Sequence, residues 1–128
     1  MKKLVFLLLA VMLLTACGQN KEKEQGAVYV NITAEEAKRI MDSEEGYIIL
    51  DVRTQEEYDQ GHIPGATQIS HEEIKEKAEK VLTDKDQLIL VYCRSGRRSK
   101  IAAEALVELG YTNIKEFGGI IDWPYETE

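Results

Sequence analysis

Apolar and polar positions change their spacing several times between residue 28 and the end of the chain. Segments 47–50 and 88–92 are continuously apolar, as expected for strands that are buried on both faces of a sheet. Segment 28–32 has a period of two, which also indicates a strand. Shorter strands are expected at residues 66–69 and 113–117. Together these segments predict a sheet whose central strands are covered on both sides.

Helices are expected between these strands, because three of the intervening segments begin with a capping box. In this motif a Ser or Thr and a Glu three residues later accept hydrogen bonds from each other's backbone N–H groups. The pairs are Thr33 with Glu36, Thr54 with Glu57, and Ser70 with Glu73. They predict helices that run to about residues 41, 60 and 81. A fourth helix is expected at 98–109, where apolar residues fall on one face and Gly110 supplies a stop.

Strands that alternate with helices are typical of an α/β fold, with a mostly parallel sheet and helices on both faces. We expect one folded domain at residues 28–128, which is an ordinary size for a compact domain. The chain contains no internal repeat.

The first sixteen residues have the order of a secretory signal peptide. Lys2 and Lys3 precede an apolar stretch at 4–14, which is shorter than the roughly 20 residues that a membrane-spanning helix needs. Small residues then lead to Cys17. The junction at 14–17 resembles the bacterial lipobox, whose cysteine is acylated and becomes the mature N-terminus. The alternative is an ordinary secretory peptide with a coincidental cysteine.

The lipobox resemblance implies that Cys17 is a lipid attachment site. Residues 17–27 are polar and lack apolar periodicity, so we expect them to form a lipid-anchored flexible tether. Lipoproteins of this class carry two or three acyl chains, and more than one chain is needed for stable anchoring. The expected location is extracytoplasmic, on the cell membrane.

The charge of the chain limits its partners. Loss of Lys2 and Lys3 with the leader takes the net charge from −7 to −9. An acidic body argues against nucleic acid as a partner. If Cys17 is acylated, Cys93 is the one remaining cysteine and no disulfide can form within the chain. A lone thiol in a secreted protein suggests reactivity.

Cys93 directly follows the apolar segment 88–92 and precedes the fourth helix. Ligands of open α/β sheets bind at the carboxyl ends of the strands, and the free N–H groups of a helix N-terminus favour an anion. Ser95 and Gly96 predict a tight turn whose successive N–H groups can surround a bound group. We call residues 93–98 the Cys93 loop.

Three arginines of the Cys93 loop, Arg94, Arg97 and Arg98, add positive charge close to the thiol. Cationic neighbours favour the thiolate form of a cysteine. We therefore expect the sulfur to be ionised and open to small oxoanions. A buried structural cysteine is the alternative for Cys93, and a solvated surface patch is the alternative for the arginines.

Five motifs, in this order, resemble the rhodanese family. They are Leu50-Asp51-Val52-Arg53, Glu56-Glu57-Tyr58 with Gly61-His62-Ile63-Pro64-Gly65-Ala66, Val91-Tyr92-Cys93-Arg94-Ser95-Gly96-Arg97-Arg98-Ser99, Leu109-Gly110-Tyr111, and Phe117-Gly118-Gly119 with Trp123. The resemblance implies a five-stranded, mostly parallel sheet with helices on both faces. It also implies a sulfurtransferase that moves a sulfane sulfur from thiosulfate, or a similar donor, to a thiol or cyanide through a Cys93 persulfide.

The resemblance assigns catalysis to Cys93 and substrate binding to the rest of the Cys93 loop: Arg94, Ser95, Gly96, Arg97 and Arg98. Position 97 departs from many single-domain members, which have a small polar residue there, and this leaves the acceptor preference open.

Three residues outside the Cys93 loop are expected to support it. Asp51 and Arg53 follow a strand at the same sheet edge. Asp51 is expected to fix the local turn; the alternatives are that it orients the backbone of the Cys93 loop, or pairs with Arg53 or a loop arginine. Glu57 caps its helix, or pairs with a loop arginine. His62 is expected to be a hydrogen-bonding turn residue rather than a general base.

The expected partners are a small anionic sulfur donor and a thiol acceptor, either a small molecule or a thioredoxin-like protein. The resemblance implies that neither a metal nor an organic cofactor is needed. No metal site is expected from the residues either, since neither histidine has a second ligand at metal spacing. A persulfide carrier or thiol-binding module that serves a partner protein is the main alternative. A phosphatase is less favoured, because the related phosphatases have a longer loop than the four residues between Cys93 and Arg98.

Overall fold

The computed structural model describes residues 28–128. Five parallel strands form one sheet, in the order β1-β5-β4-β2-β3. The strands are β1 (Val30–Asn31), β2 (Ile48–Asp51), β3 (Thr67–Gln68), β4 (Ile89–Cys93) and β5 (Ile114–Gly119). The predicted α/β fold is confirmed, and every pairing within the sheet is parallel.

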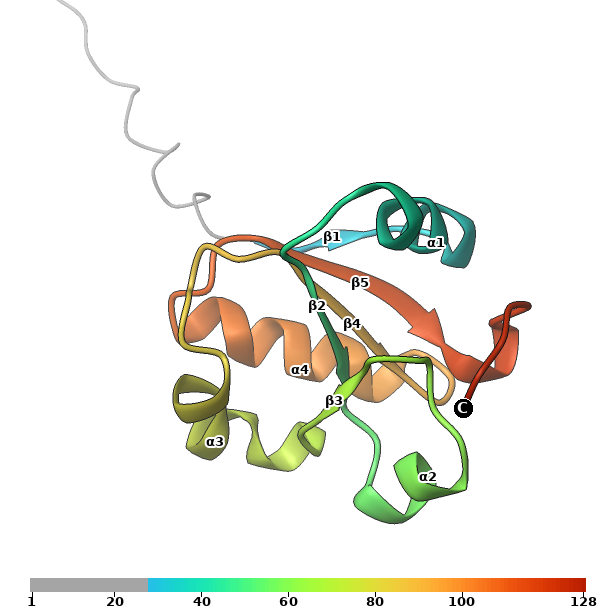
Figure 1. Cartoon of the computed structure of the whole chain (residues 1–128). Helices are drawn as coiled ribbons and strands as arrows, with labels where there is room; N and C mark the ends of the chain where they lie inside the picture. Colours follow the sequence, from blue (N-terminus) through green and yellow to red (C-terminus); the bar gives the residue numbers. More distant parts are fainter. Residues whose placement is uncertain (1–27) are drawn as a thin grey trace, which may run out of the picture.

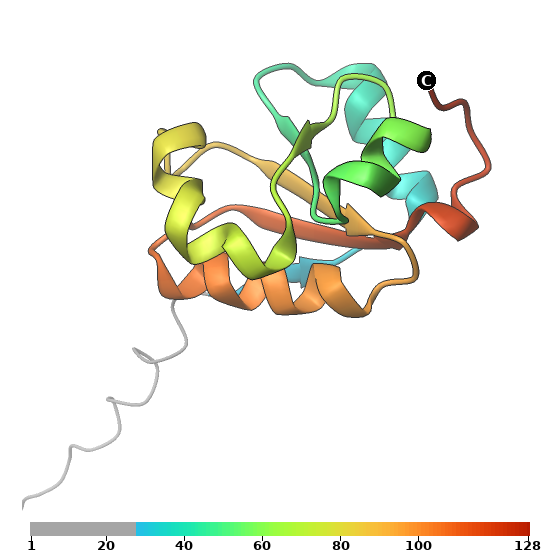
Figure 2. The ribbon, with the colours of Figure 1, turned by 90° about the horizontal axis from the view of Figure 1, so that it is seen from below.

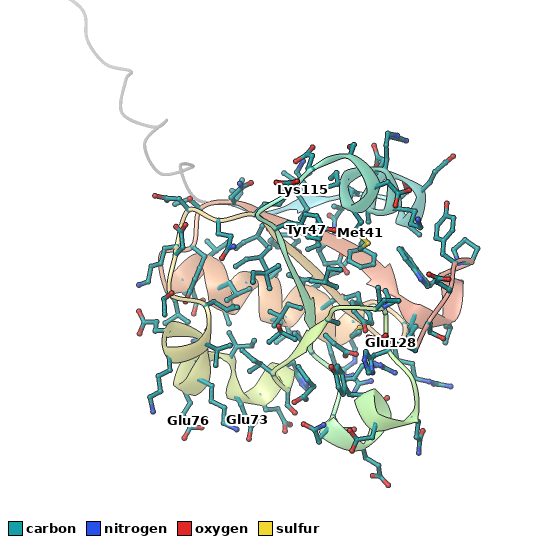
Figure 3. All side chains as sticks on the ribbon, in the orientation of Figure 1. Met41, Tyr47, Glu73, Glu76, Lys115 and Glu128 are labelled. Atoms are coloured by element: carbon teal, nitrogen blue, oxygen red, sulfur yellow. The ribbon has the colours of Figure 1, made fainter. Side chains whose placement is uncertain are left out.

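Helices cover both faces of this sheet. They are α1 (Ala34–Ser43), α2 (Gln55–Gln60), α3 (Ile74–Val81) and α4 (Arg97–Glu108), with short 3₁₀ helices at η2 (His71–Glu73) and η3 (Ile120–Asp122). In Figures 1 and 2, α3 and α4 lie side by side on one face of the sheet, and α1 lies on the other. Glu73 and Glu76 point away from the sheet, on the outer side of this helical layer (Figure 3).

Two of the three predicted capping boxes are present. Thr33 with Glu36 begins α1, and Thr54 with Glu57 begins α2. The prediction for Ser70 was wrong, because its side chain makes no capping hydrogen bond. The Ser70 hydroxyl instead accepts from Gln68 Nε2 at 3.1 Å and lies 3.4 Å from the carbonyl of Arg53. The chain therefore enters α3 through a 3₁₀ turn.

The central strand β4 is buried along its whole length and contributes to two separate cores. Ile89, Val91 and Cys93 face α3 and α4, where they pack with residues such as Leu106. Leu90 and Tyr92 face α1, with Phe117 and Trp123. Burial on both faces explains why the segment is continuously apolar in sequence. The alternation also places the thiol on the α4 side.

Some predicted boundaries differ from the structure. The strand predicted at 28–32 is shorter in the structure. Strand β1 has two residues, Val30 is half exposed, and β1 lies at the edge of the sheet with β5 as its one neighbour. Helix α4 begins at Arg97, one residue earlier than predicted, and the chain leaves it through Gly110 at φ 96°. The predicted signal peptide, Cys17 and the tether lie outside the described residues. Between residues 28 and 128, no helix has the length and hydropathy needed to cross a membrane.

The packing of α4 on the sheet can be tested at Leu106, which is fully buried. We expect Leu106→Ala to lower the free energy of unfolding by about 2–5 kcal/mol, because the substitution leaves a cavity in the core. Ile101 on the same helix is 42% exposed, so Ile101→Ala is the control and should cost less than about 0.5–1 kcal/mol. Urea unfolding measures both. Similar losses for the two variants would contradict this packing.

Candidate active site

Cys93 is the last residue of β4, and it pairs with Gly119 of β5 across the carboxyl edge of the sheet. Its side chain is 1% exposed. The Gly96 N–H donates a hydrogen bond to Cys93 Sγ at 3.0 Å. The Cys93 loop therefore folds back over its own sulfur. The prediction of a sulfur open to oxoanions was wrong for this conformation, because the covering turn comes from the same loop that supplies the N–H group.

Two glycines make this fold of the Cys93 loop possible. Gly96 precedes α4 with a left-handed φ of 108°, a conformation that a side chain would strain. Gly119 lies against the loop backbone, and a Cβ there would be 2.0 Å from the carbonyl oxygen of Arg94. That same carbonyl accepts from the Ile121 N–H at 3.2 Å. The end of β5 thus supports the loop from outside, a role that the sequence analysis missed.

Arg98 is held by Glu57 through two hydrogen bonds, with N–O distances of 2.9 and 3.0 Å. Glu57 also completes the capping box of α2, so both of its proposed roles are present at once. The bonds from Arg98, followed by those from the Thr54 backbone and hydroxyl, outweigh burial and lower the pKa of Glu57 to about 2. The pKa of Arg98 is raised, mainly by the hydrogen bond to Glu57.

The remaining polar residues of the Cys93 loop face solvent. Arg94, Ser95 and Arg97 are all exposed. Two of the three arginines are therefore open to solvent, while the third, Arg98, is fixed by Glu57. An approaching anion would meet this exposed positive charge before it reached the covered sulfur.

Asp51 and Arg53 form a buried pair of their own. Arg53 Nη2 donates to Asp51 Oδ2 at 2.6 Å and to the carbonyl of Gly61 at 2.8 Å, and the Tyr92 hydroxyl donates to Asp51 at 2.6 Å. Burial favours neutral Arg53, but the hydrogen bonds and charge of Asp51 outweigh it and raise the pKa of Arg53. The pair fixes the turn after β2, as expected for Asp51.

His62 is a turn residue. Its ring stacks on Tyr58 with centroids 3.7 Å apart, and Nδ1 lies 2.9 Å from the Tyr58 carbonyl. Its backbone pairs with that of Glu128, whose position is labelled in Figure 3. These contacts agree with the structural role that the sequence predicts for His62.

Two residues beneath the thiol escaped the sequence analysis as site residues. Cys93 Sγ lies 3.4 Å from Ser99 Oγ, and the Ser99 hydroxyl is hydrogen-bonded to Glu116 Oε2. Ser99 and Glu116 are 0% and 2% exposed. A sequence signal for Glu116 existed, since it is a carboxylate within the strand predicted at 113–117.

A parallel α/β domain with a single cysteine in an arginine-rich strand-to-helix loop is an arrangement suited to covalent chemistry at a thiol. The model of the Rhodanese-like domain matches residues 33–124 of this chain. The chain therefore belongs to the rhodanese family, and it is a rhodanese-type sulfurtransferase.

Curated relatives and solved structures agree with this assignment. Thiosulfate sulfurtransferase PspE of Escherichia coli is 42% identical over 73 residues, which are 57% of this chain and 70% of PspE. Putative sulfur carrier protein YrkF of Bacillus subtilis is 36% identical over 112 residues, 87% of this chain but only 60% of YrkF. A rhodanese with anions from E. coli has a TM-score of 0.60 at 38% identity, covering 64% of this chain and 96% of that one. The Alr3790 protein from Anabaena has a TM-score of 0.70 at 29% identity, covering 76% and 90%.

The Arg98–Glu57 pair makes stability depend on pH. A carboxylate whose pKa is lowered on folding stabilises the protein above its unfolded value of about 4.3, and this stabilisation is lost as the pH falls toward the folded value of about 2. We expect Glu57→Gln to cost about 1–2 kcal/mol at pH 7, since the pair is partly exposed. The difference from the wild type should shrink between about pH 5 and pH 2.

Chemical unfolding as a function of pH measures this difference. The matched control is Glu56→Gln, which removes an exposed neighbouring carboxylate of α2 and should change stability little at any pH. A difference for Glu57→Gln that stays constant down to pH 2 would contradict the assigned cause.

Proposed function

We propose that the protein transfers a sulfane sulfur from thiosulfate, or a similar small anion, to a thiol or cyanide through a persulfide on Cys93. The observation that carries the proposal is the hydrogen bond from the Gly96 N–H to Cys93 Sγ at 3.0 Å, in a loop that opens a helix. Backbone N–H groups directed at sulfur stabilise a negative sulfur atom. They would serve the thiolate and, after loading, the persulfide.

The proposed reaction has two displacement steps. In the first, the Cys93 thiolate attacks the outer sulfur of thiosulfate, a new S–S bond forms, and sulfite leaves with the electron pair of the broken bond. In the second, an acceptor thiolate or cyanide attacks the outer sulfur of the persulfide and the Cys93 thiolate leaves. No net electron transfer occurs, so neither step needs a redox cofactor.

The arginines have separate parts in this mechanism. Arg94 and Arg97 are exposed and attract the anionic donor, while Arg98 is held by Glu57 and keeps the start of α4 in place. Because Cys93 is covered, the donor reaches the sulfur only when the exposed part of the Cys93 loop around Ser95 moves aside.

A second candidate is a persulfide carrier that delivers sulfur to a partner protein without rapid turnover of small donors. Two observations favour it: the relative YrkF is named a putative sulfur carrier protein, and the thiol is almost fully covered. Fast loading of Cys93 without steady-state turnover of thiosulfate and cyanide would favour the carrier over the enzyme. The partner of such a carrier would be a thiol protein of the thioredoxin-like kind.

We also propose that Cys17 is lipid-modified and that residues 17–27 tether the domain to the extracytoplasmic side of the cell membrane. The support is the order of residues 2–17, in which a basic start and an apolar stretch lead to the lipobox-like junction.

Loading of Cys93 can be measured directly by mass spectrometry after incubation with thiosulfate. We expect the protein to gain the mass of one sulfur atom, and Cys93→Ser to gain nothing. Serine replaces the sulfur by one oxygen atom, and a cooperative thermal unfolding transition of the variant is the control that it is folded. Acylation of Cys17 would appear in the same spectrum of protein from its native host. Turnover of an aryl phosphate with no sulfur gain would contradict the proposal.

The attraction of the donor can be tested at Arg97. We expect Arg97→Ala to raise the KM for thiosulfate about threefold to tenfold at low ionic strength with little change in kcat, because the exposed charge acts mainly on the approach of the anion. The effect should fade at about 0.5–1 M salt. Arg39→Ala removes an equally exposed arginine from α1 and is the control. Equal effects of the two substitutions would show that only net charge matters.

A further inference from the structure

The buried carboxylate of Glu116 lies behind Cys93, on the α4 side of the sheet. It is 2% exposed, and Glu116 pairs in register with Val91 of β4, two residues before the thiol. A carboxylate is costly to bury unless it is hydrogen-bonded. Nothing in the persulfide chemistry described above uses this group, so its place under the nucleophile calls for an explanation.

Donors surround the Glu116 carboxylate. Asn31 Nδ2 donates to Oε1 at 2.6 Å, and the Gly118 N–H donates to Oε2 at 3.0 Å. The Ser99 hydroxyl bonds Oε2, and the ammonium group of Lys100 lies 3.6 Å from Oε1. Each carboxylate oxygen of Glu116 thus accepts a hydrogen bond from an N–H group, and a cation lies nearby. Glu116 is therefore an acceptor, and Ser99 is its donor.

Because Glu116 accepts from Ser99, the direction of the hydrogen bond between Ser99 and Cys93 follows. The hydroxyl has one hydrogen and three possible acceptors: Glu116, the Gly96 carbonyl at 3.1 Å and the Gly118 carbonyl at 3.5 Å. The charged carboxylate is the strongest of them. With its hydrogen directed to Glu116, Ser99 accepts from the Cys93 thiol at 3.4 Å. Both hydrogens, that of the thiol and that of the Ser99 hydroxyl, then point from the sulfur toward the carboxylate.

Because Cys93 is covered, the hydrogen bonds from Cys93 through Ser99 to Glu116 offer a route for the thiol proton. While the Cys93 loop is closed, the thiol is 1% exposed, so a proton that leaves before the donor arrives has to pass to a protein group. The other group bonded to the sulfur, the Gly96 N–H, is a donor and cannot take a proton. Ser99 is the acceptor that remains among the contacts of the sulfur. At the other end of these hydrogen bonds, Glu116 lies beside Lys100, whose side chain is about half exposed to solvent.

We propose that Glu116 is a positioning residue that, through Ser99, receives the proton of the Cys93 thiol as the sulfur becomes nucleophilic. The S–H bond breaks as Ser99 Oγ takes that proton, and the original Ser99 hydroxyl proton moves to Glu116 Oε2. The products are a thiolate, a hydroxyl and a neutral carboxylic acid. When the acceptor removes the sulfur and the thiolate reappears, the proton returns along the same path. This inference rests on the proposed persulfide chemistry.

Charged and titratable groups from several elements lie near Cys93, Ser99 and Glu116. Helix α4 contributes Lys100, beside Glu116, and Arg98, whose charge is paired with Glu57 of α2. Strand β1 contributes Asn31, which is uncharged, and β4 contributes the thiol itself. Among the described residues in direct contact with Glu116, Lys100 is thus the one cation.

The test is the rate of persulfide loading by thiosulfate in a single turnover, measured from pH 5 to 10 by the mass gain on Cys93. We expect Glu116→Gln to load roughly tenfold to a hundredfold more slowly at pH 7, the lower range for an assisted proton transfer. The loss should shrink toward the alkaline end of this range, because hydroxide then competes with Glu116 for the proton. Glu116→Asp keeps the carboxylate and should retain part of the rate.

Ser99→Ala provides the second arm of a double-mutant cycle. Because Glu116 acts through Ser99, adding Glu116→Gln to Ser99→Ala should cause no further loss. Glu104→Gln removes an exposed carboxylate from α4 and should load like the wild type. If Glu116→Gln does not fold, as judged by its thermal unfolding, the pH profile of Ser99→Ala against that of Glu104→Gln decides the question.

Three outcomes would overturn the proposed transfer of the thiol proton through Ser99 to Glu116. They are unchanged loading in Glu116→Gln, additive losses in the double variant, or faster loading of Glu116→Gln at low pH. The last would show that the carboxylate only opposes negative charge on the sulfur. A wild-type protein that gains no sulfur at any pH would instead overturn the persulfide function, so the two failures are distinguishable.

Discussion

The hydrogen bond from the Gly96 N–H to the Cys93 sulfur is the contact around which the site is built. It exists because Gly96 adopts a left-handed φ and because Gly119 lets β5 approach the carbonyl of Arg94 closely. Without either glycine, the Cys93 loop could not close over the sulfur in this form. The same closure that directs an N–H group at the sulfur also removes the sulfur from solvent. The conformation that stabilises negative charge on the sulfur is therefore not the one that a sulfur donor can reach.

Charge is arranged in layers around that bond. Arg94 and Arg97 are exposed outside, Arg98 is fixed by Glu57 beside the loop, and Glu116 is buried on the inner side. In the proposed mechanism the outer charges act on the anionic donor and the inner carboxylate acts on the thiol proton. In this proposal a single cysteine is both protected at rest and ready to react, because different residues govern the arrival of the donor and the release of the proton.

The local elements of the fold were largely predictable. The continuous apolar segments became β2 and β4, and the capping boxes at Thr33 and Thr54 are present as predicted. The motif at Ser70 failed, because its hydroxyl is held by Gln68, two residues earlier, and by the carbonyl of Arg53. The contact with Arg53 joins segments 17 residues apart, which local sequence does not encode. The length of β1 was overestimated, because an edge strand has only one neighbour to define its extent.

The sequence by itself determined the alternation of strands and helices, and with it the place of Cys93 at the junction of a buried strand and a helix, since these follow from periodicity over short segments. Only the tertiary structure decided that the sulfur is covered, that Glu57 holds Arg98, and that Glu116 and Ser99 lie beneath the thiol. These contacts join residues 17 to 41 positions apart, or depend on the close approach of two backbones. They arise from the pairing of β5 with β4 and the packing of α2 near the loop, which no local pattern specifies.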